Sequence, residues 1–141
     1  MASSSSSEGI LERPARSAAR TMLIIDDEAA VARTLGRAAE ECGWRPTLTG
    51  TGEAFRAAYR ADPPVVVIID LALVGTDGIE ILKFLAEEES ESLVLIASGF
   101  DRRVVEAAMR FGREVGLRIG GALPKPVLVE DLKCALAAAR R

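Results

Sequence analysis

The sequence predicts an α/β domain in which helices cover both faces of a parallel β-sheet. Five short apolar runs alternate with amphipathic helical patterns from Thr21 onward, which is typical of repeated strand-helix units. The apolar runs are nearly continuous, as in strands that are buried on both faces of a sheet. Hydrophobic residues make up 49% of the 141-residue chain, so one domain with a substantial core is expected.

The expected strands and helices alternate strictly along the chain. Gly43 ends the first helical pattern, and the Asp62–Pro64 segment ends the second. The third apolar run, Val65 to Ile69, is the most hydrophobic and is expected at the centre of the sheet. The expected strands are residues 22–25, 45–48, 65–69, 93–96 and 117–123, and the expected helices are residues 28–42, 52–60, 78–88, 101–115 and 127–139.

Residues 1–20 differ in composition from the rest of the chain. They are rich in Ser, Ala and Arg and show no hydrophobic periodicity, so we expect a disordered tail (1–20) ahead of one domain (21–141). The serine run from Ser3 to Ser7 has no apolar segment behind it, which argues against a signal peptide. Cys42 and Cys134 lie within apolar helical patterns and are expected to be buried free thiols, in keeping with a reducing cytoplasm.

The composition excludes several kinds of chemistry. The chain contains no histidine, which excludes a Ser-His-Asp triad, a Cys-His dyad, histidine-ligated zinc and a phosphohistidine formed on this chain. The formal net charge of -3 argues against direct binding to nucleic acid or to an anionic membrane surface. No apolar run is long enough to span a bilayer. Any chemistry therefore depends on carboxylates, hydroxyls and lysines.

Polar residues stand where four of the five expected strands end. Asp26 and Asp27 follow the first strand, Asp70 follows the third, Ser98 the fourth and Lys125 the fifth. Because the carboxyl ends of parallel strands lie at one edge of the sheet, these side chains are expected to converge there. Three crowded carboxylates favour a hard cation such as Mg²⁺, and Asp70 is a candidate nucleophile that would form an acyl phosphate. Lys125 and Ser98 would then contact phosphoryl oxygens.

Each of these residues also has a purely structural interpretation. An Asp pair ahead of a helix commonly serves as an N-cap. A single Asp, Ser or Lys in a loop commonly ends a strand, closes a turn or faces solvent. It is their joint occurrence, in this order at four strand ends, that indicates a phosphoryl-transfer site.

Four short motifs carry a resemblance to a known family. These are the acidic pair within Ile24–Glu28, Asp70 with Asp77-Gly78 downstream, Ile96–Gly99, and Pro124–Pro126. With them, the chain from Thr21 to Ala139 resembles the receiver domains of response regulators in two-component signalling. The resemblance implies a flavodoxin-like, doubly wound (βα)5 sandwich whose five-stranded parallel sheet has the strand order 2-1-3-4-5.

The resemblance also implies a role for each residue of the acidic site. Asp70 is the expected phosphoacceptor, and Asp27 is expected to be a direct ligand of Mg²⁺. Asp26 would act mainly through a metal-bound water, and the main-chain carbonyl of Ala72 would face the same ion.

The remaining residues of the site are expected to respond to the phosphoryl group. Ser98 resembles the switch hydroxyl of the family, and Lys125 resembles its phosphate-sensing lysine. The peptide bond between Lys125 and Pro126 is cis in similar proteins. Phe100 is expected to shield the acyl phosphate from water.

The phosphoryl donor that the resemblance implies is a sensor histidine kinase or a histidine phosphotransfer protein. Only residues 126–141 follow Lys125, so a stand-alone or excised receiver without an output domain is expected. Such a protein is a signalling phosphoacceptor rather than an enzyme. It is expected to act in the cytoplasm on an unidentified downstream protein and is a candidate homodimer, without direct contact to nucleic acid or membrane.

Two departures from the family leave other functions open. Ala122 stands where an aromatic switch residue is usual, and Val74 stands where a proline is usual, which suggests an interaction module that no longer uses phosphorylation. A phosphatase of the haloacid dehalogenase kind would use the same chemical groups. Such an enzyme needs a second Asp two residues after the nucleophile, where this chain has Ala72, and its acidic pair comes late in the chain.

Overall fold

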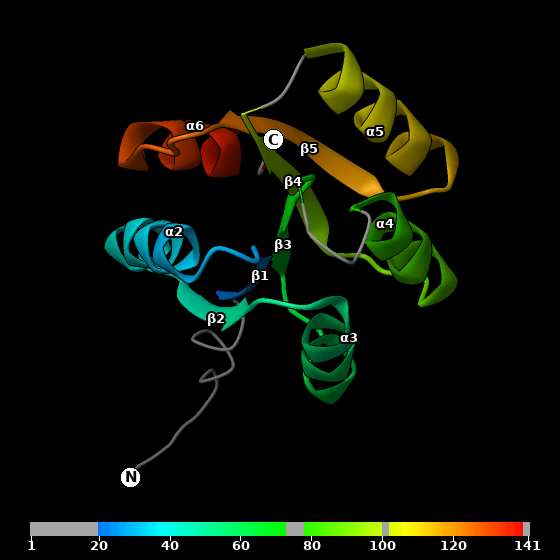
Figure 1. Ribbon diagram of the computed structural model, residues 1–141, viewed down its shortest axis with the longest axis horizontal. Helices are drawn as coiled ribbons and strands as arrows, with labels where there is room; N and C mark the ends of the chain where they lie inside the picture. The colour runs from blue at the N-terminus through cyan, green and yellow to red at the C-terminus, as the bar shows by residue number, and fades with distance from the viewer. Residues whose placement is uncertain (1–19, 73–77, 100–101, 140–141) are drawn as a thin grey trace, which may run out of the picture.

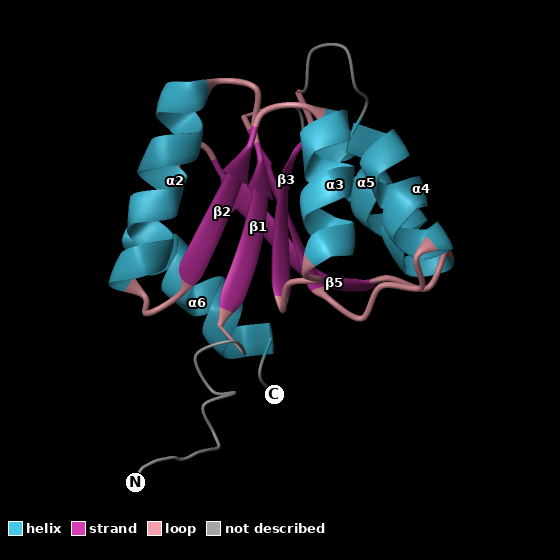
Figure 2. Cartoon of the chain, turned by 90° about the horizontal axis from the view of Figure 1, so that it is seen from below, coloured by secondary structure: helices cyan, strands magenta, loops and turns pink. Residues whose placement is uncertain are grey.

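The computed structural model describes residues 20–72, 78–99 and 102–139, which form an α/β domain of three layers (Figures 1 and 2). Neighbouring strands pair in parallel throughout, in the order β2-β1-β3-β4-β5. The strands are β1 (Thr21–Ile25), β2 (Arg45–Thr49), β3 (Val66–Asp70), β4 (Leu93–Ser98) and β5 (Arg118–Pro124). The predicted fold class and strand order are therefore confirmed.

The helices of the described residues cover both faces of the sheet. Two of them, α2 and α6, lie on one face, and α3, α4 and α5 lie on the other (Figure 1). The helices are α2 (Ala29–Glu41), α3 (Gly52–Ala61), α4 (Gly78–Glu87), α5 (Arg102–Glu114) and α6 (Val129–Ala139).

Each face of the sheet has its own apolar core. Successive side chains of a strand point to opposite faces, and β3 shows this clearly. Val67 and Ile69 belong to the core beneath α3, α4 and α5, whereas Val66 and Ile68 belong to the core beneath α2 and α6. Every one of these four side chains is buried. Burial on both faces explains why the central strands are continuously apolar in sequence.

Four strands, β2 to β5, continue one or two residues further toward the functional edge than predicted, and two of them thereby include a residue of the predicted site. β3 includes Asp70 and β4 includes Ser98, because the ladder pairs Asp70 with Ala97 and Ser98 with Pro124. The apolar pattern ends before the strand pairing does, so it marks the strand ends too early. As a consequence, Asp70 and Ser98 are held by regular strand rather than by a loop.

The two cysteines are free but less buried than predicted. Cys42 is half-buried and Cys134 is exposed. In α6, Leu132 and Leu136 are buried against the sheet, and Cys134 lies about 200° around the helix from each of them. The prediction of a buried thiol at Cys134 is therefore wrong. The alanines and leucines of α6 make the helix apolar on more than the side that faces the core, so an apolar pattern around Cys134 did not mean burial.

Several predictions concern residues outside the described part of the chain. The tail (1–19), Val74, Asp77 and Phe100 all lie there, so the disorder of the tail and the shielding by Phe100 stay predictions. Among residues 20–72, 78–99 and 102–139, no helix is long and apolar enough to cross a membrane. The cytoplasmic location stays a prediction as well.

Candidate functional site

The carboxyl ends of four strands bring the predicted site residues to one edge of the sheet. Asp26 and Asp27 follow β1, and Asp70 and Ser98 are the last residues of β3 and β4. Asp26, Asp70 and Ser98 are buried, while Asp27 is half-buried. One carboxylate oxygen from each of the three aspartates lies within 4.8 Å of the other two. We call Asp26, Asp27 and Asp70 the acidic cluster.

Lys125, which follows β5, places its ammonium group between two of these carboxylates. Its Nζ donates a hydrogen bond to Oδ2 of Asp26 at 2.9 Å and lies 3.1 Å from Oδ1 of Asp70. The Lys125 side chain is 19% exposed, against 1% and 3% for Asp26 and Asp70, so water screens these ion pairs little. The ammonium group of Lys125 thus pairs with two of the three carboxylates of the acidic cluster.

Main-chain amides fix the orientation of two carboxylates of the acidic cluster. Oδ1 of Asp26 accepts a hydrogen bond from the amide of Glu28 at 2.9 Å, and Oδ1 of Asp70 accepts one from the amide of Ala72 at 3.0 Å. In both cases the donor lies two residues after the aspartate, which is the geometry of an Asx turn. Each buried carboxylate is therefore held by one amide and by the ammonium group of Lys125.

The environment of the site shifts two pKa values. Burial raises the pKa of Asp70 above its ordinary value of 3.8, although the Ala72 amide and the Lys125 ammonium group stabilise the ionised form; the charge of Asp26 adds to the rise. Burial alone would lower the pKa of Lys125, but hydrogen bonds and charges from Asp26 and Asp70 outweigh it and raise that pKa above 10.5. Lys125 is therefore a cation at neutral pH.

Strand pairing places Ser98 and Lys125 beside Asp70. Asp70 pairs with Ala97, the residue before Ser98, and Ser98 pairs with Pro124, the residue before Lys125. The peptide bond between Lys125 and Pro126 is cis, as the resemblance implies.

The donor set of the acidic cluster fits a hard divalent cation. Its oxygens come from three carboxylates within a few ångströms, two of which are buried and pair with Lys125. No soft thiolate ligand belongs to the cluster, and the chain has no imidazole. Carboxylate and carbonyl oxygens favour Mg²⁺, which also retains waters and binds phosphate oxygens. The half-buried Ala72 contacts the acidic cluster through its amide, and the role of its carbonyl oxygen stays a prediction.

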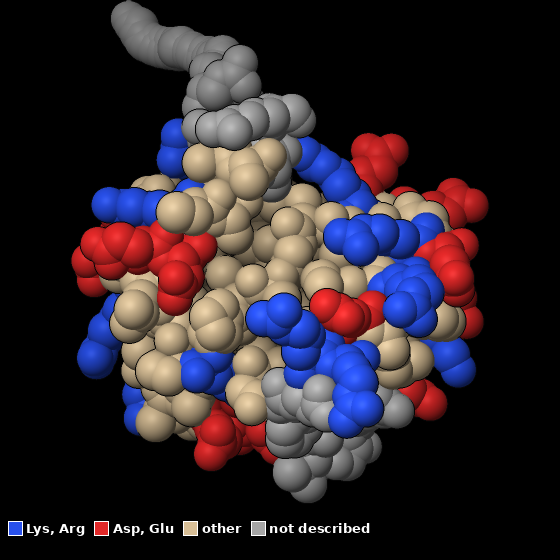
Figure 3. Space-filling model, turned by 90° about the horizontal axis from the view of Figure 1, so that it is seen from above, with Lys and Arg blue, Asp and Glu red and all other residues tan. Residues whose placement is uncertain are grey.

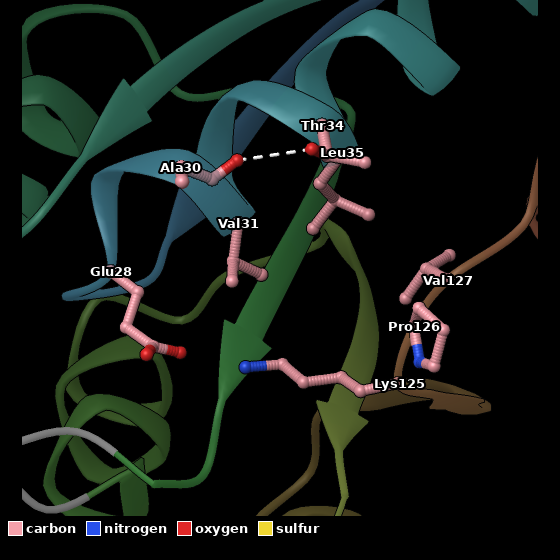
Figure 4. Close-up of a pocket in the computed structure, with 8 residues that line it drawn as sticks. All are labelled: Glu28, Ala30, Val31, Thr34, Leu35, Lys125, Pro126 and Val127. Atoms are coloured by element: carbon pink, nitrogen blue, oxygen red, sulfur yellow. Dashed lines mark hydrogen bonds between the residues drawn. The ribbon is translucent and has the colours of Figure 1, made fainter.

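A groove of about 450 Å³ adjoins the acidic cluster (Figure 4). It lies between the start of α2 and the segment after β5, and most of its lining is apolar, with Val31, Leu35 and Val127 among the side chains. The carboxylate of Glu28 and the ammonium group of Lys125 point toward one another across it (Figure 4). Sequence reasoning missed both this groove and the contact of Lys125 with Asp26, because the segments involved are about a hundred residues apart.

Comparison with protein families and curated proteins gives consistent matches. The family model of the response regulator receiver domain matches residues 22–137. The chain is 32% identical over 123 residues to the probable transcriptional regulatory protein TcrX of Mycobacterium tuberculosis, covering 86% of this chain and 50% of that protein. It is 27% identical over 118 residues to the photosynthetic apparatus regulatory protein RegA of Rhodovulum sulfidophilum, covering 82% and 61%. The chain thus spans about half to three fifths of the length of these relatives.

Solved structures show the same fold. A response regulator from Colwellia psychrerythraea superposes with a TM-score of 0.72 and 26% identity, covering 87% of this chain and 98% of that one. The chemotaxis protein CheY4 of Vibrio cholerae superposes with a TM-score of 0.73 at 19% identity, covering 84% and 97%, which shows the fold alone. From the family match over nearly all of the described chain, and from the site at the strand ends, the protein belongs to the response regulator receiver domains, the phosphoacceptor modules of two-component signalling.

Proposed function

We propose that this chain accepts a phosphoryl group on Asp70 from a phosphohistidine of a sensor histidine kinase or a histidine phosphotransfer protein. A carboxylate oxygen of Asp70 attacks the phosphorus, the bond between phosphorus and the histidine nitrogen breaks, and an acyl phosphate forms. The histidine belongs to another protein, because this chain contains none. The main support is the position of Asp70, which is buried at the end of β3 next to the ammonium group that it shares with a second buried carboxylate.

The residues around Asp70 would bind and orient the phosphoryl group. Asp26, Asp27 and Asp70, with the carbonyl of Ala72, would hold Mg²⁺, which when bound supplies positive charge against the phosphoryl oxygens. Lys125 supplies a second positive charge, and Ser98 supplies a hydroxyl donor to a phosphoryl oxygen. Lys125 already lies against Asp70, so its charge is in place where the new negative charge arrives.

The donor protein is proposed to lie in the groove beside the acidic cluster. Lys125 lines this groove and also contacts Asp70, so a protein surface seated there is next to the phosphoacceptor. The apolar lining suits the apolar face of a helix. Val31→Asp should therefore slow phosphoryl transfer from a protein donor, while phosphorylation by acetyl phosphate stays unchanged. Equal slowing with both donors would contradict docking in the groove.

The proposed output of phosphorylation is a change in α5. Ser98 and Lys125 would move toward the phosphoryl group, and α5 is the next helix in the chain after Ser98. The exposed side of α5 carries four arginines and two glutamates: Arg102, Arg103, Glu106, Arg110, Arg113 and Glu114. Figure 3 shows basic and acidic side chains next to one another on one side of the molecule. Ala122 is exposed on β5 and has no aromatic ring that could take part in the usual relay of the family. Sedimentation with and without beryllofluoride tests whether the change produces a homodimer.

Intact-protein mass spectrometry tests the phosphoacceptor role. Incubation with Mg²⁺ and acetyl phosphate should add one phosphoryl group to the wild-type chain. Asp70→Asn and excess EDTA should each abolish the gain, while Asp62→Asn, at an exposed aspartate outside the site, should leave it unchanged.

Two other outcomes would favour the alternatives. If the wild-type chain gains no phosphoryl group and does not bind beryllofluoride, the protein is a phosphorylation-independent interaction module. Hydrolysis of an aryl phosphate that requires Asp70 would instead show a phosphatase, although Ala72 offers no general acid at the position where such enzymes carry one.

A further inference from the structure

Thr49, the last residue of β2, makes two contacts with the end of β1. Its hydroxyl oxygen Oγ1 donates a hydrogen bond to the main-chain carbonyl of Ile24 at 2.8 Å. Its own main-chain carbonyl accepts a hydrogen bond from the amide of Asp26 at 3.1 Å. Thr49 and Ile25 form the last pair of the ladder between β2 and β1. The two hydrogen bonds therefore hold Ile24 and Asp26, the residues on either side of Ile25.

The end of β1 has to be placed accurately because it leads directly into Asp26 and Asp27. The carboxylate of Asp26 meets the amide of Glu28 and the ammonium group of Lys125 at the same time, both at 2.9 Å. Asp27 is the next residue, so two of the three aspartates of the acidic cluster depend on this one stretch of main chain. A small shift of the peptide groups at the end of β1 would move both carboxylates relative to Asp70.

We propose that Thr49 is a positioning residue for the acidic cluster, and that its hydroxyl fixes the end of β1 so that Asp26 and Asp27 meet Asp70 in the arrangement that binds a divalent cation. Thr49 is half-buried, so its hydroxyl could form a hydrogen bond with water instead. Burial alone therefore does not require the bond to Ile24. The bond instead ties an edge strand to the strand that carries two of the three carboxylates. This inference rests on the metal site of the proposed function.

The test compares Thr49→Val, which removes the hydroxyl and keeps the side-chain shape, with Thr49→Ser, which keeps the hydroxyl. Isothermal titration of the full chain with MgCl₂ measures affinity without any phosphoryl donor. Outer contacts of metal ligands typically contribute roughly tenfold or more to affinity, so Thr49→Val should bind Mg²⁺ about ten times more weakly and Thr49→Ser close to wild type. Thr47→Val, the same change at an exposed position of β2, is the matched control and should bind like wild type.

The remaining outcomes separate positioning from general support of the fold. Urea denaturation in EDTA measures stability without metal; if Thr49→Val is less stable but binds Mg²⁺ with wild-type affinity, the positioning role is wrong. Thr49→Ala also lacks the hydroxyl and has to weaken Mg²⁺ binding as Thr49→Val does; wild-type affinity in either variant overturns the inference. A wild-type chain that binds no Mg²⁺ would refute the proposed metal site itself, and the inference with it.

Discussion

Lys125 joins two buried carboxylates that would otherwise repel one another. Its ammonium group lies 2.9 Å from a carboxylate oxygen of Asp26 and 3.1 Å from one of Asp70. Each of these carboxylates also accepts a hydrogen bond from a main-chain amide. Burying charged groups costs free energy unless they are paired and hydrogen-bonded, and here both conditions are met. The same ammonium group is in position to meet a phosphoryl group on Asp70, so its structural and chemical roles share one geometry.

Removing the ammonium group should destabilise the fold. Lys125→Met keeps much of the apolar stem but leaves Asp26 and Asp70 without their common partner. In EDTA at neutral pH, the free energy of unfolding measured by urea denaturation should fall by about 3 kcal/mol, the low end for a buried ion pair that loses one partner, because Lys125 is partly exposed. Lys83→Met, at an exposed lysine of α4, is the matched control and should change it by less than about 0.5 kcal/mol. Equal losses in the two variants would contradict a stabilising role for the Lys125 ion pairs.

The raised pKa of Asp70 predicts a direction for the pH dependence of stability. A carboxyl group whose pKa is higher in the folded than in the unfolded state binds its proton more tightly when folded, so its protonation favours folding. In EDTA, this contribution should be fully present below the ordinary pKa of 3.8 and should be lost as pH rises through the raised pKa. The Asp70→Asn variant has no titrating carboxyl group at position 70 and therefore lacks this contribution to stability.

Urea denaturation of both proteins at a series of pH values measures this contribution. The unfolding free energy of the wild type minus that of Asp70→Asn should decrease as pH rises from about 4 toward neutrality. Titrating groups outside the acidic cluster and Lys125 contribute nearly equally to both proteins and largely cancel in the difference. A difference that stays constant, or that increases with pH, would contradict a raised pKa at Asp70.

At the scale of elements, the side chains of Leu93 and Leu95 on β4 fill the space next to Gly120 on β5. A Cβ atom at Gly120 would come within 2.7 Å of Cδ1 of Leu93 and 3.0 Å of Cδ2 of Leu95. The strand pairing shifts its register at Val94 and Leu95, and Gly121 has a φ of 139°, so this part of β5 bulges. The Gly120-Gly121 pair therefore lets β5 follow β4 on its way to Lys125.

Gly120→Ala should destabilise the fold by about 1–3 kcal/mol, because the new methyl group overpacks the space next to Leu93 and Leu95. Thermal or urea denaturation in EDTA measures the change. Gly50→Ala is the control, since its new methyl group would lie 3.8 Å from the main-chain oxygen of Asp26, at ordinary contact distance. A Gly120→Ala variant as stable as Gly50→Ala would show that the packing around Gly120 is looser than these distances indicate.

Most elements could be predicted from hydrophobic patterning, with ends displaced by one or two residues. β3 and β4 run to Asp70 and Ser98 because strand pairing continues into polar residues, which a hydrophobic pattern cannot report. The exposure of Cys134 could not be predicted, because an alanine-rich helix is apolar around much of its circumference and its sequence does not indicate which side packs against the sheet. The strand order came from the family resemblance, since periodicity does not encode which strands are neighbours.

At the scale of the whole molecule, the acidic cluster exists only when the strands are assembled, so a cation that binds it should stabilise the fold. At a Mg²⁺ concentration a hundredfold above the dissociation constant, the free energy of unfolding should rise by about 2.7 kcal/mol. Asp27→Asn should lose most of this gain, and Asp62→Asn should keep it. Denaturation with and without Mg²⁺ measures the gain, and an undiminished gain in Asp27→Asn would place the ion elsewhere.

The residues of the candidate site could be identified from the sequence because parallel strands deliver their ends to one edge. The contacts between them could not be predicted, since they join segments from distant parts of the chain. Three features depend on how neighbouring strands and helices pack. They are the hydrogen bond from Lys125 to Asp26, the groove between α2 and Val127, and the hydrogen bond from the Thr49 hydroxyl to the carbonyl of Ile24. Spacing within one segment carries no information about them.

The most direct test of the phosphoacceptor role identifies the residue that carries the phosphoryl group. Borohydride reduces an aspartyl phosphate to homoserine, so the chain is incubated with Mg²⁺ and a phosphoryl donor, reduced, digested and sequenced by tandem mass spectrometry. We predict homoserine at position 70, absent when EDTA is added before the donor. Homoserine at position 26 or 27, or a phosphoryl group found on a side chain other than Asp70, would contradict the assignment of Asp70 as the phosphoacceptor.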